Sequence, residues 1–214
     1  MRYAAVVFDL DGTLLDTLSD LTDSVNAAYR AFGYPQRTAD EVRMAVGNGS
    51  GMLIERTLPG GRKNPDFDRV LAWYSDYYPK HCQIKTAPYP GVLELLRTLT
   101  GREYALAVVS NKPDDAVRPL VRRFFGAYIS VAAGEKPGVR RKPAPDTIFA
   151  ALRELDLTPA EAVYVGDSEV DLKTAAAAGL DCVSVTWGFR SRELLLSAGA
   201  AQLADRPQDV LKLV

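Results

Sequence analysis

Two aspartates stand one residue apart, directly after an apolar run near the start of the chain, in Ala4-Ala5-Val6-Val7-Phe8-Asp9-Leu10-Asp11. Residues i and i+2 of a strand point to the same side, so Asp9 and Asp11 can face one cleft beyond the strand end. Carboxylates this close repel one another unless a cation lies between them. Hard oxygen ligands suit Mg²⁺. The pair predicts a divalent-metal site or, because Asp-Gly is a common turn sequence, a solvated turn.

A second pair of acids follows another apolar run, in Val165-Gly166-Asp167-Ser168-Glu169-Val170-Asp171. Asp167 comes just after the run, and Asp171 falls in the first turn of the helix that we expect next, from which it can reach the cleft. Capping of that helix would explain Asp167 or Ser168. It would not explain acids at the ends of two strands, so the two pairs together favour the metal site.

Two further segments carry groups that bind anions. Val109-Ser110-Asn111-Lys112-Pro113 offers a hydroxyl, an amide and backbone N–H groups where a helix is expected to begin, an arrangement that binds phosphate. Arg141-Lys142-Pro143-Ala144-Pro145 places Lys142 beside stiffening prolines. A lysine held in this way is better suited to be a fixed counter-charge than a freely solvated side chain.

The elements that position these residues alternate between strand and helix. Near-continuous apolar runs, typical of buried parallel strands, occur at 4–8, 104–109, 162–165 and 181–185, with a weaker candidate at 127–131. Helical patterns cover 113–125, 145–155 and 169–178, the last ending at Gly179. The alternation predicts an α/β fold with a parallel sheet and right-handed crossovers. Ligands of such sheets bind at the carboxyl ends of the strands.

Residues 17–86 have a different character, with helical patterns and no clear strand. Apolar side chains recur at helical spacing from Leu18 to Phe32, Thr38 and Glu41 fit a capping box, and a third helix follows Asn64-Pro65. Glycine-rich breaks at 47–51 and 60–61 are expected to separate these helices. We predict an all-helical insertion over 17–86, with a core formed by 1–16 and 87–214.

Composition narrows the function classes. The 214 residues are 47% apolar and 25% charged, as in ordinary globular proteins, and the formal net charge of -1 provides no field for nucleic acid or an anionic membrane. Cys82 and Cys182 are too far apart in sequence to suggest a disulfide framework. The first apolar run is too short for a signal peptide, and no run is long enough to span a bilayer. We expect a cytoplasmic monomer or homodimer that binds neither nucleic acid nor membranes.

Four segments, FDLDGTLLD, VVSNKP, RKPAPD and GDSEVD, resemble in this order the four signature motifs of the haloacid dehalogenase superfamily. They are most similar to those of its phosphoglycolate phosphatase-like branch. The resemblance runs from Val6 to about Phe189, and AVGNGSGMLIERTL in the insertion also resembles a segment of those phosphatases. It implies a Rossmann-like, doubly wound core with an inserted helical cap. It also implies a phosphatase that hydrolyses a small phosphomonoester, with 2-phosphoglycolate as the first expected substrate.

The resemblance implies catalytic roles for the motif residues. Asp9 would be the nucleophile that becomes an aspartyl-phosphate, and Asp11 would be the general acid for the leaving group and then the base for water. Ser110 and the backbone of Asn111 would hold the transferring phosphoryl group. Lys142 would neutralise charge on the nucleophile and on the phosphate, which a carboxylate attacking a phosphate dianion requires.

The resemblance further implies a Mg²⁺ cofactor held by Asp9, by the main-chain carbonyl of Asp11 and by Asp167. Asp171 would support this metal shell. Hydrolysis would then occur in two displacements, formation and breakdown of the aspartyl-phosphate. One carboxylate would act as the nucleophile and its neighbour would transfer the protons.

The cap is expected to close over the cleft and exclude water. Its loop at 47–51, with Asn48 and Gly49, is a candidate substrate contact, because small residues allow close backbone approach. Arg43 is a candidate partner for a substrate carboxylate, although its sequence position favours a solvated place on a helix surface. The tyrosines of the third cap helix are expected in the cap interior or on a dimer face, rather than at the substrate: Tyr74, Tyr77 and Tyr78.

Other functions remain open at this point. A phosphomutase of the same branch would return the phosphoryl group to a substrate, and a pyrophosphatase or nucleotidase would share the core motifs. Dehalogenation, in which Asp9 displaces halide, needs no metal, so the acidic set argues against it. A non-enzymatic phospho-acceptor of the two-component receiver kind would carry its acceptor on a later strand. A degraded binding protein would not be expected to keep all four motifs.

Overall fold

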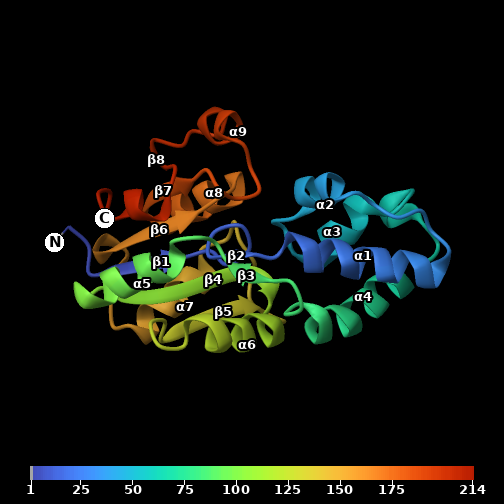
Figure 1. The fold of residues 1–214 in the computed structure, drawn as a ribbon, viewed down its shortest axis with the longest axis horizontal. Coiled ribbons are helices and arrows are strands. Elements are labelled where there is room, and N and C mark those ends of the chain that lie inside the picture. The colour runs from blue at the N-terminus through green and yellow to red at the C-terminus, as the bar shows by residue number, and fades with distance from the viewer. Residues whose placement is uncertain (1) are drawn as a thin grey trace.

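The computed structural model describes residues 2–214 and contains a six-stranded sheet with helices on both faces (Figure 1). The order across the sheet is β5-β4-β1-β6-β7-β8, and each neighbouring pair is parallel. The strands are β1 (Ala5–Phe8), β4 (Ala105–Pro113), β5 (Val131–Glu135), β6 (Ala162–Gly166), β7 (Asp181–Val185) and β8 (Gln202–Ala204). The predicted α/β fold with a Rossmann-like parallel sheet is confirmed.

Strand β1 lies in the middle of the sheet and is buried on both faces. Its side chains alternate: Val6 and Phe8 join one apolar cluster, and Ala5 and Val7 join the other. The first cluster contains side chains of α5 (Val92–Gly101), α6 (Asp114–Phe125) and α10 (Pro207–Val210). The second contains side chains of α7 (Asp146–Glu154) and α8 (Glu169–Ala178). Two-sided burial explains why this strand is a continuous apolar run.

A group of helices lies between β2 (Leu15–Asp16) and β3 (Ala87–Pro88), at the right of Figure 1. It consists of α1 (Leu18–Phe32), α2 (Ala39–Ala45), α3 (Gly49–Thr57), the 3₁₀ turn η1 (Gly61–Lys63) and α4 (Phe67–His81). β2 and β3 pair in antiparallel fashion, with Asp16 opposite Ala87. The chain therefore enters and leaves the helical group at neighbouring points.

The remaining elements are α9 (Arg192–Ser197), near the C-terminus, and the 3₁₀ turn η2 (Pro159–Glu161) before β6. Within residues 2–214, no helix is both long enough and apolar enough to cross a membrane.

Capping residues and glycines in the sequence correctly predicted the ends of several helices. Thr38 and Glu41 form the reciprocal hydrogen bonds of a capping box at the start of α2. Gly33 and Gly179 end α1 and α8 with φ of 75° and 74°, in the left-handed region that glycine reaches without a steric penalty.

Three sequence-based boundaries were wrong. The glycine-rich break expected at 47–51 does separate two helices, but it is shorter, because α2 ends at Ala45 and α3 already begins at Gly49. Leu53 and Ile54 of α3 are buried in the helical group, and their packing outweighs the poor helix propensity of glycine. The weak strand candidate at 127–131 begins only at Val131, since the preceding residues close the end of α6. β4 continues to Pro113, so the SNK segment belongs to the strand and α6 begins at Asp114.

Asp20 of α1 ties the returning chain to the helical group. Its buried carboxylate accepts hydrogen bonds from the backbone N–H groups of Ile84, Lys85 and Thr86 at 2.9–3.0 Å. One side chain thus satisfies three backbone donors in the segment that leads from α4 to β3. This interaction fixes the second crossing between the helical group and the sheet.

Replacing Asp20 by Ala should lower the free energy of unfolding by about 3 kcal/mol, because it leaves these backbone donors without their charged acceptor. Urea denaturation followed by circular dichroism measures the change. Asp23→Ala is the matched control, since Asp23 makes an exposed ion pair with Lys85 from the same helix. Its effect should be much smaller. Equal effects of the two substitutions would show that Asp20 does not hold the crossing.

Candidate active site

The functional side chains gather where β1, β4 and β6 end. The chain runs outward from β1 to β4 and β5 on one side, and then crosses to β6, β7 and β8 on the other. The carboxyl ends of the strands beside β1 therefore flank the point at which the strand order reverses, where open parallel sheets bind ligands. Asp9 follows β1, Ser110 to Lys112 lie near the end of β4, and Asp167 follows β6.

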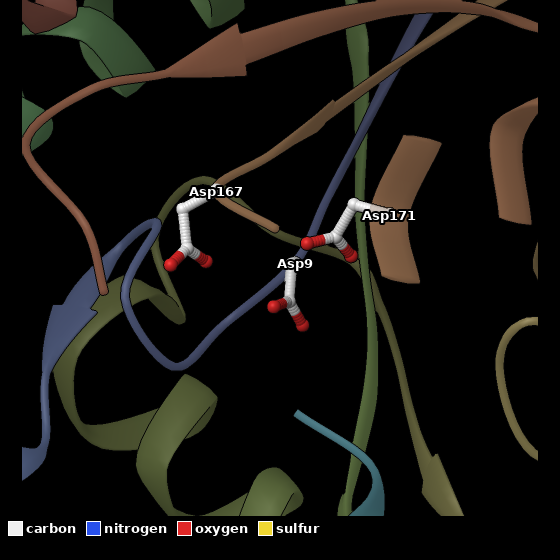
Figure 2. A group of neighbouring side chains, drawn as sticks. All are labelled: Asp9, Asp167 and Asp171. Carbon is white, nitrogen blue, oxygen red and sulfur yellow. The ribbon is translucent and has the colours of Figure 1, made fainter. Parts of the chain in front are cut away.

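Three carboxylates meet at this edge (Figure 2). Asp9, Asp167 and Asp171 each offer an oxygen atom within 4.8 Å of the others, and all three residues are buried. Burial, together with the charges of Asp171 and Asp9, raises the pKa of Asp167 well above its usual range. Burial raises the pKa of Asp9 to about 7 in spite of the opposing charge of Lys142. Three buried acids in one place, with oxygen atoms as the donors, fit a hard divalent cation.

Lys142 is the cation that the structure places against these acids. Its Nζ lies 2.9 Å from Asp9 Oδ1 and 2.8 Å from Asp171 Oδ1, and it donates to the Tyr164 hydroxyl at 2.9 Å. Burial opposes the charge, but Asp171 and Asp9 outweigh it and raise the pKa of Lys142 well above its ordinary value. Lys142 therefore stays positively charged beside the carboxylate of Asp9.

The backbone of Lys142 is fixed by the side chain of Asn111. The Lys142 N–H donates to Asn111 Oδ1 at 2.8 Å, and Asn111 Nδ2 donates to the Lys142 carbonyl at 2.9 Å. The same amide nitrogen donates to the carbonyl of Gly47, between α2 and α3, at 2.9 Å. One amide thus links β4, the lysine loop and the helical group.

Asp167 and Asp171 are held in different ways. Asp167 accepts hydrogen bonds from Thr13 Oγ1 at 3.1 Å and from the Phe189 N–H at 2.7 Å, and it lines the cavity. Both oxygens of Asp171 are engaged by Lys142, Tyr164 and Ser168. Asp171 therefore supports the lysine and the helix start, whereas Asp167 faces open space.

Asp11 lies next to the nucleophile candidate in sequence but has a separate partner. Its carboxylate contacts Lys112 Nζ at 2.8 and 3.1 Å, and Lys112 Nζ also donates to the hydroxyl of Tyr78 in α4. The side chains of Asp9 and Asp11 thus contact different lysines, and a metal ion beside Asp9 stays a prediction. Each carboxylate has its own buried lysine.

These groups line one cavity between the sheet edge and the helical group, with an empty volume of about 600 Å³ including its opening to solvent. Of the predicted site residues, the lining contains Asp9, Asp11, Gly49, Ser110, Asn111, Lys142 and Asp167. Asp171 lies behind Lys142. The lining combines charged, polar and apolar side chains, as in sites for small molecules.

Two candidate cap residues lie outside the cavity. Arg43 pairs with Asp40 at 3.1 Å on the surface of α2, because the i,i+3 spacing brings the two side chains together. Asn48 accepts a hydrogen bond from Arg56 at 2.8 Å across the start of α3. Neither side chain lines the cavity, so substrate contacts from Arg43 and Asn48 stay predictions that the geometry does not favour.

Among the lysine, arginine and tyrosine side chains of the lining, four were missed or misplaced by the sequence analysis: Lys112, Arg190, Tyr74 and Tyr78. The two tyrosines are buried as expected, but they line the cavity, whereas Tyr77 stacks between Trp73 and His81 on another face of α4. The i,i+4 spacing of Tyr74 and Tyr78 was the available signal, since it places both on one side of the helix.

Arg190 follows β7 and joins the sheet domain to the helical group. It donates to Glu169 at 3.0 Å and to the carbonyls of Arg43 and Val46 at 2.9 and 2.7 Å. These carbonyls lie at the C-terminal end of α2, where helix carbonyls lack helical partners and a cation is favourable. Arg190 and Asn111 together hold the helices over the cavity.

Comparison with known proteins places this geometry in a family. The sequence model of the haloacid dehalogenase-like hydrolase family matches residues 6–185 of this chain. The chain belongs to this family. A phosphoglycolate phosphatase of Pseudomonas putida is 35% identical over 86% of this chain and 70% of its own length. Phosphoglycolate phosphatase 1 of Pseudomonas aeruginosa is 31% identical over 96% of this chain and 78% of its own length.

The fold has a counterpart in a crystal structure from Lactobacillus delbrueckii subsp. bulgaricus that carries a provisional assignment as a phosphoglycolate phosphatase. The TM-score is 0.95 at 36% identity, and the match covers 100% of this chain and 98% of that chain. The chain is a hydrolase of the haloacid dehalogenase-like family. The predictions of this family and of a phosphatase for small phosphoesters are confirmed.

Two glycines allow Asp167 to sit where it does. A Cβ atom on Gly12 or on Gly188 would lie within 3.0 Å of Asp167 atoms, closer than real Cβ atoms approach their neighbours, and Gly12 also has φ of 88°. We expect Gly188→Ala to displace the Asp167 carboxylate and to weaken divalent-cation binding about 10- to 100-fold. Titration calorimetry measures the affinity. Gly101→Ala, with open space around its Cβ, is the control, and equal cation affinity in both variants would contradict the expectation.

Proposed function

We propose that this protein is a Mg²⁺-dependent phosphatase that hydrolyses 2-phosphoglycolate through an aspartyl-phosphate on Asp9. One observation carries the proposal: the buried Asp9 carboxylate has Lys142 Nζ 2.9 Å away and the carboxylate of Asp167 in the same cluster. A carboxylate that attacks a phosphate dianion needs positive charge on both flanks. Lys142 supplies one flank, and the acids supply a binding site for the other.

The phosphoryl group is assigned to the end of β4. Ser110 lines the cavity, and its Oγ accepts a hydrogen bond from the Lys112 N–H at 3.2 Å, which leaves the hydroxyl hydrogen available to a phosphoryl oxygen. The Asn111 side chain is fully used in fixing Lys142 and Gly47. Asn111 therefore acts on the phosphoryl group through its backbone, while Lys142 offsets the negative charge at Asp9.

Asp11 is assigned the proton transfers. It donates a proton to the leaving oxygen in the first displacement, and it takes one from the attacking water in the second. The ion pair with Lys112 fixes the direction in which the Asp11 carboxylate points. Two neighbouring carboxylates with different lysine partners are thus suited to different tasks.

The residues present fit a magnesium site. The Asp9 and Asp167 carboxylates and the main-chain carbonyl of Asp11 would hold the ion, and Asp171 would support them through Lys142 and Ser168. The bound ion offsets the charge repulsion between nucleophile and phosphate. Buried hard oxygen donors with few other protein ligands are typical of Mg²⁺.

Residues 17–86 are proposed to act as the cap. They supply Leu21, Leu53 and the two tyrosines to the cavity, and so cover the phosphoryl site and exclude water from it. The choice of 2-phosphoglycolate rests on the names of the relatives. The cytoplasmic location, the monomeric or homodimeric state and the absence of nucleic-acid and membrane partners stay predictions.

A phosphate-release assay over a panel of small phosphoesters tests the proposal. With Mg²⁺, the wild-type protein should release inorganic phosphate from 2-phosphoglycolate faster than from sugar phosphates, nucleotides or pyrophosphate. EDTA should abolish the activity and added Mg²⁺ should restore it, while Asp9→Asn should show none. Phosphate release by Asp9→Asn would refute the covalent mechanism, and transfer between sugar phosphates without release would identify a mutase.

Asp11→Asn should lower kcat for 2-phosphoglycolate on the order of a hundredfold or more, the usual contribution of a positioned acid or base. With 4-nitrophenyl phosphate the leaving group needs no proton, so the variant should still release a burst of nitrophenolate before slow turnover. Rapid mixing with detection of nitrophenolate measures the burst. A full wild-type rate on 2-phosphoglycolate would remove Asp11 from proton transfer.

A further inference from the structure

Lys112 is a buried cation that the proposed mechanism uses only indirectly. Its side chain is 1% exposed, yet it lines the cavity, and Nζ contacts the Asp11 carboxylate and the Tyr78 hydroxyl. Nζ also lies 4.6 Å from the centre of the Tyr78 ring. A buried lysine at the wall of a substrate cavity is costly unless its charge is used.

The comparison with Lys142 shows what Lys112 lacks. Lys142 Nζ has three partner groups, two carboxylates and the Tyr164 hydroxyl. Lys112 Nζ has a carboxylate and a tyrosine hydroxyl, but within residues 2–214 no second carboxylate lies against it. Lys112 thus has one carboxylate partner fewer than Lys142, and it lines the cavity.

Two tyrosine hydroxyls stand on the same side of the cavity. Tyr74 and Tyr78 stack with ring centres 5.3 Å apart, and both line the cavity. Burial, and then the charge of Asp11, raises the pKa of both phenols, so each remains a neutral donor. In the described part of the chain, the Tyr74 hydroxyl has no hydrogen-bond partner, and the Tyr78 hydroxyl accepts from Lys112.

The other cations of the described cavity wall already have several partners within the protein. Lys142 serves Asp9, and Arg190 is held by Glu169 and by the carbonyls at the end of α2. The remaining cap residues of the wall are apolar or small: Leu21, Val46, Gly47, Gly49, Ser50 and Leu53. Lys112 also holds an ion pair, with Asp11, but it has one carboxylate partner fewer than Lys142 and lies beside two tyrosine hydroxyls, so we assign it to a charged group of a substrate.

The position of Lys112 also limits the length of the substrate that can reach both it and the phosphoryl site. Ser110 and Lys112 are two residues apart near the end of β4, and both line the cavity. A molecule with its phosphoryl group at Ser110 therefore needs a short carbon chain to reach Lys112. Acids of two or three carbons have this length.

We propose that Lys112, with the hydroxyls of Tyr74 and Tyr78, binds the carboxylate of the substrate and selects phosphate esters of short hydroxy acids. This inference rests on the proposed function and adds its specificity determinant. The binding site draws the lysine from the sheet domain and the tyrosines from α4, so it is complete when the helices cover the cavity.

The test compares 2-phosphoglycolate with ethyl phosphate, which has the same two-carbon skeleton without the carboxylate. The readout is the ratio of their kcat/KM values in the Mg²⁺-loaded protein. The wild type should prefer 2-phosphoglycolate at least 100-fold. Lys112→Met should lower this ratio about 10- to 100-fold, and Tyr74→Phe about tenfold, since each removes a donor to a charged group. Tyr77→Phe, on another face of α4, should leave the ratio unchanged.

The ratio of the two kcat/KM values is the informative measurement because Lys112 also orients Asp11. A loss of that orientation would slow the hydrolysis of both esters alike. If Lys112→Met lowers both kcat/KM values equally, then Lys112 only positions Asp11 and the inference is overturned. A wild-type protein that hydrolyses both esters equally well also overturns it, while leaving the phosphatase proposal intact. Failure of the wild type to hydrolyse any phosphoester would instead refute the proposed function. If Lys112→Met does not fold, as judged by circular dichroism, the ratio for Tyr74→Phe decides.

Discussion

The structure depends on balancing buried negative charge at the end of a parallel sheet. Asp9, Asp167 and Asp171 lie within one small volume, and Asp11 follows Asp9 closely in sequence. Isolated charges of this kind are too costly to bury, so each needs a cation or strong donors in fixed positions. The fold meets this demand with two buried lysines from different segments, Lys142 against the cluster and Lys112 against Asp11.

Fixing a lysine at such a place requires more than its own side chain. The loop that carries Lys142 is held by the Asn111 amide, and that amide also binds the Gly47 carbonyl of the cap. Arg190 adds a second connection from the sheet domain to α2. The charge balance at Asp9 and the position of the cap are therefore linked through Asn111. A displacement of the helices would remove the hydrogen bond from Asn111 to Gly47, and so one of the bonds that orient the amide on which Lys142 depends.

Sequence reasoning located the acids because strand ends are visible as apolar runs. Asp9 and Asp167 each follow such a run, and the parallel topology brings their positions together whatever the details of packing. It did not find the partner of Asp11, because the contact with Lys112 and Tyr78 joins residues more than thirty positions apart in two domains. The start of α3 was missed for a similar reason, since buried Leu53 and Ile54 stabilise a helix that its glycines disfavour. Periodicity within a segment does not show which segment packs against it.

The two lysines show how similar local chemistry can support different roles. Each contacts a catalytic-site carboxylate and a tyrosine hydroxyl, and each is shielded from solvent. Lys142 is enclosed by the sheet and α8, so its partners are all internal and its charge serves Asp9. Lys112 lies closer to the cap, and its tyrosine comes from a helix of that cap. Because the cavity passes between these two domains, a charge at this boundary acts on whatever molecule the cap encloses, whereas a charge deeper in the sheet acts on the reaction centre.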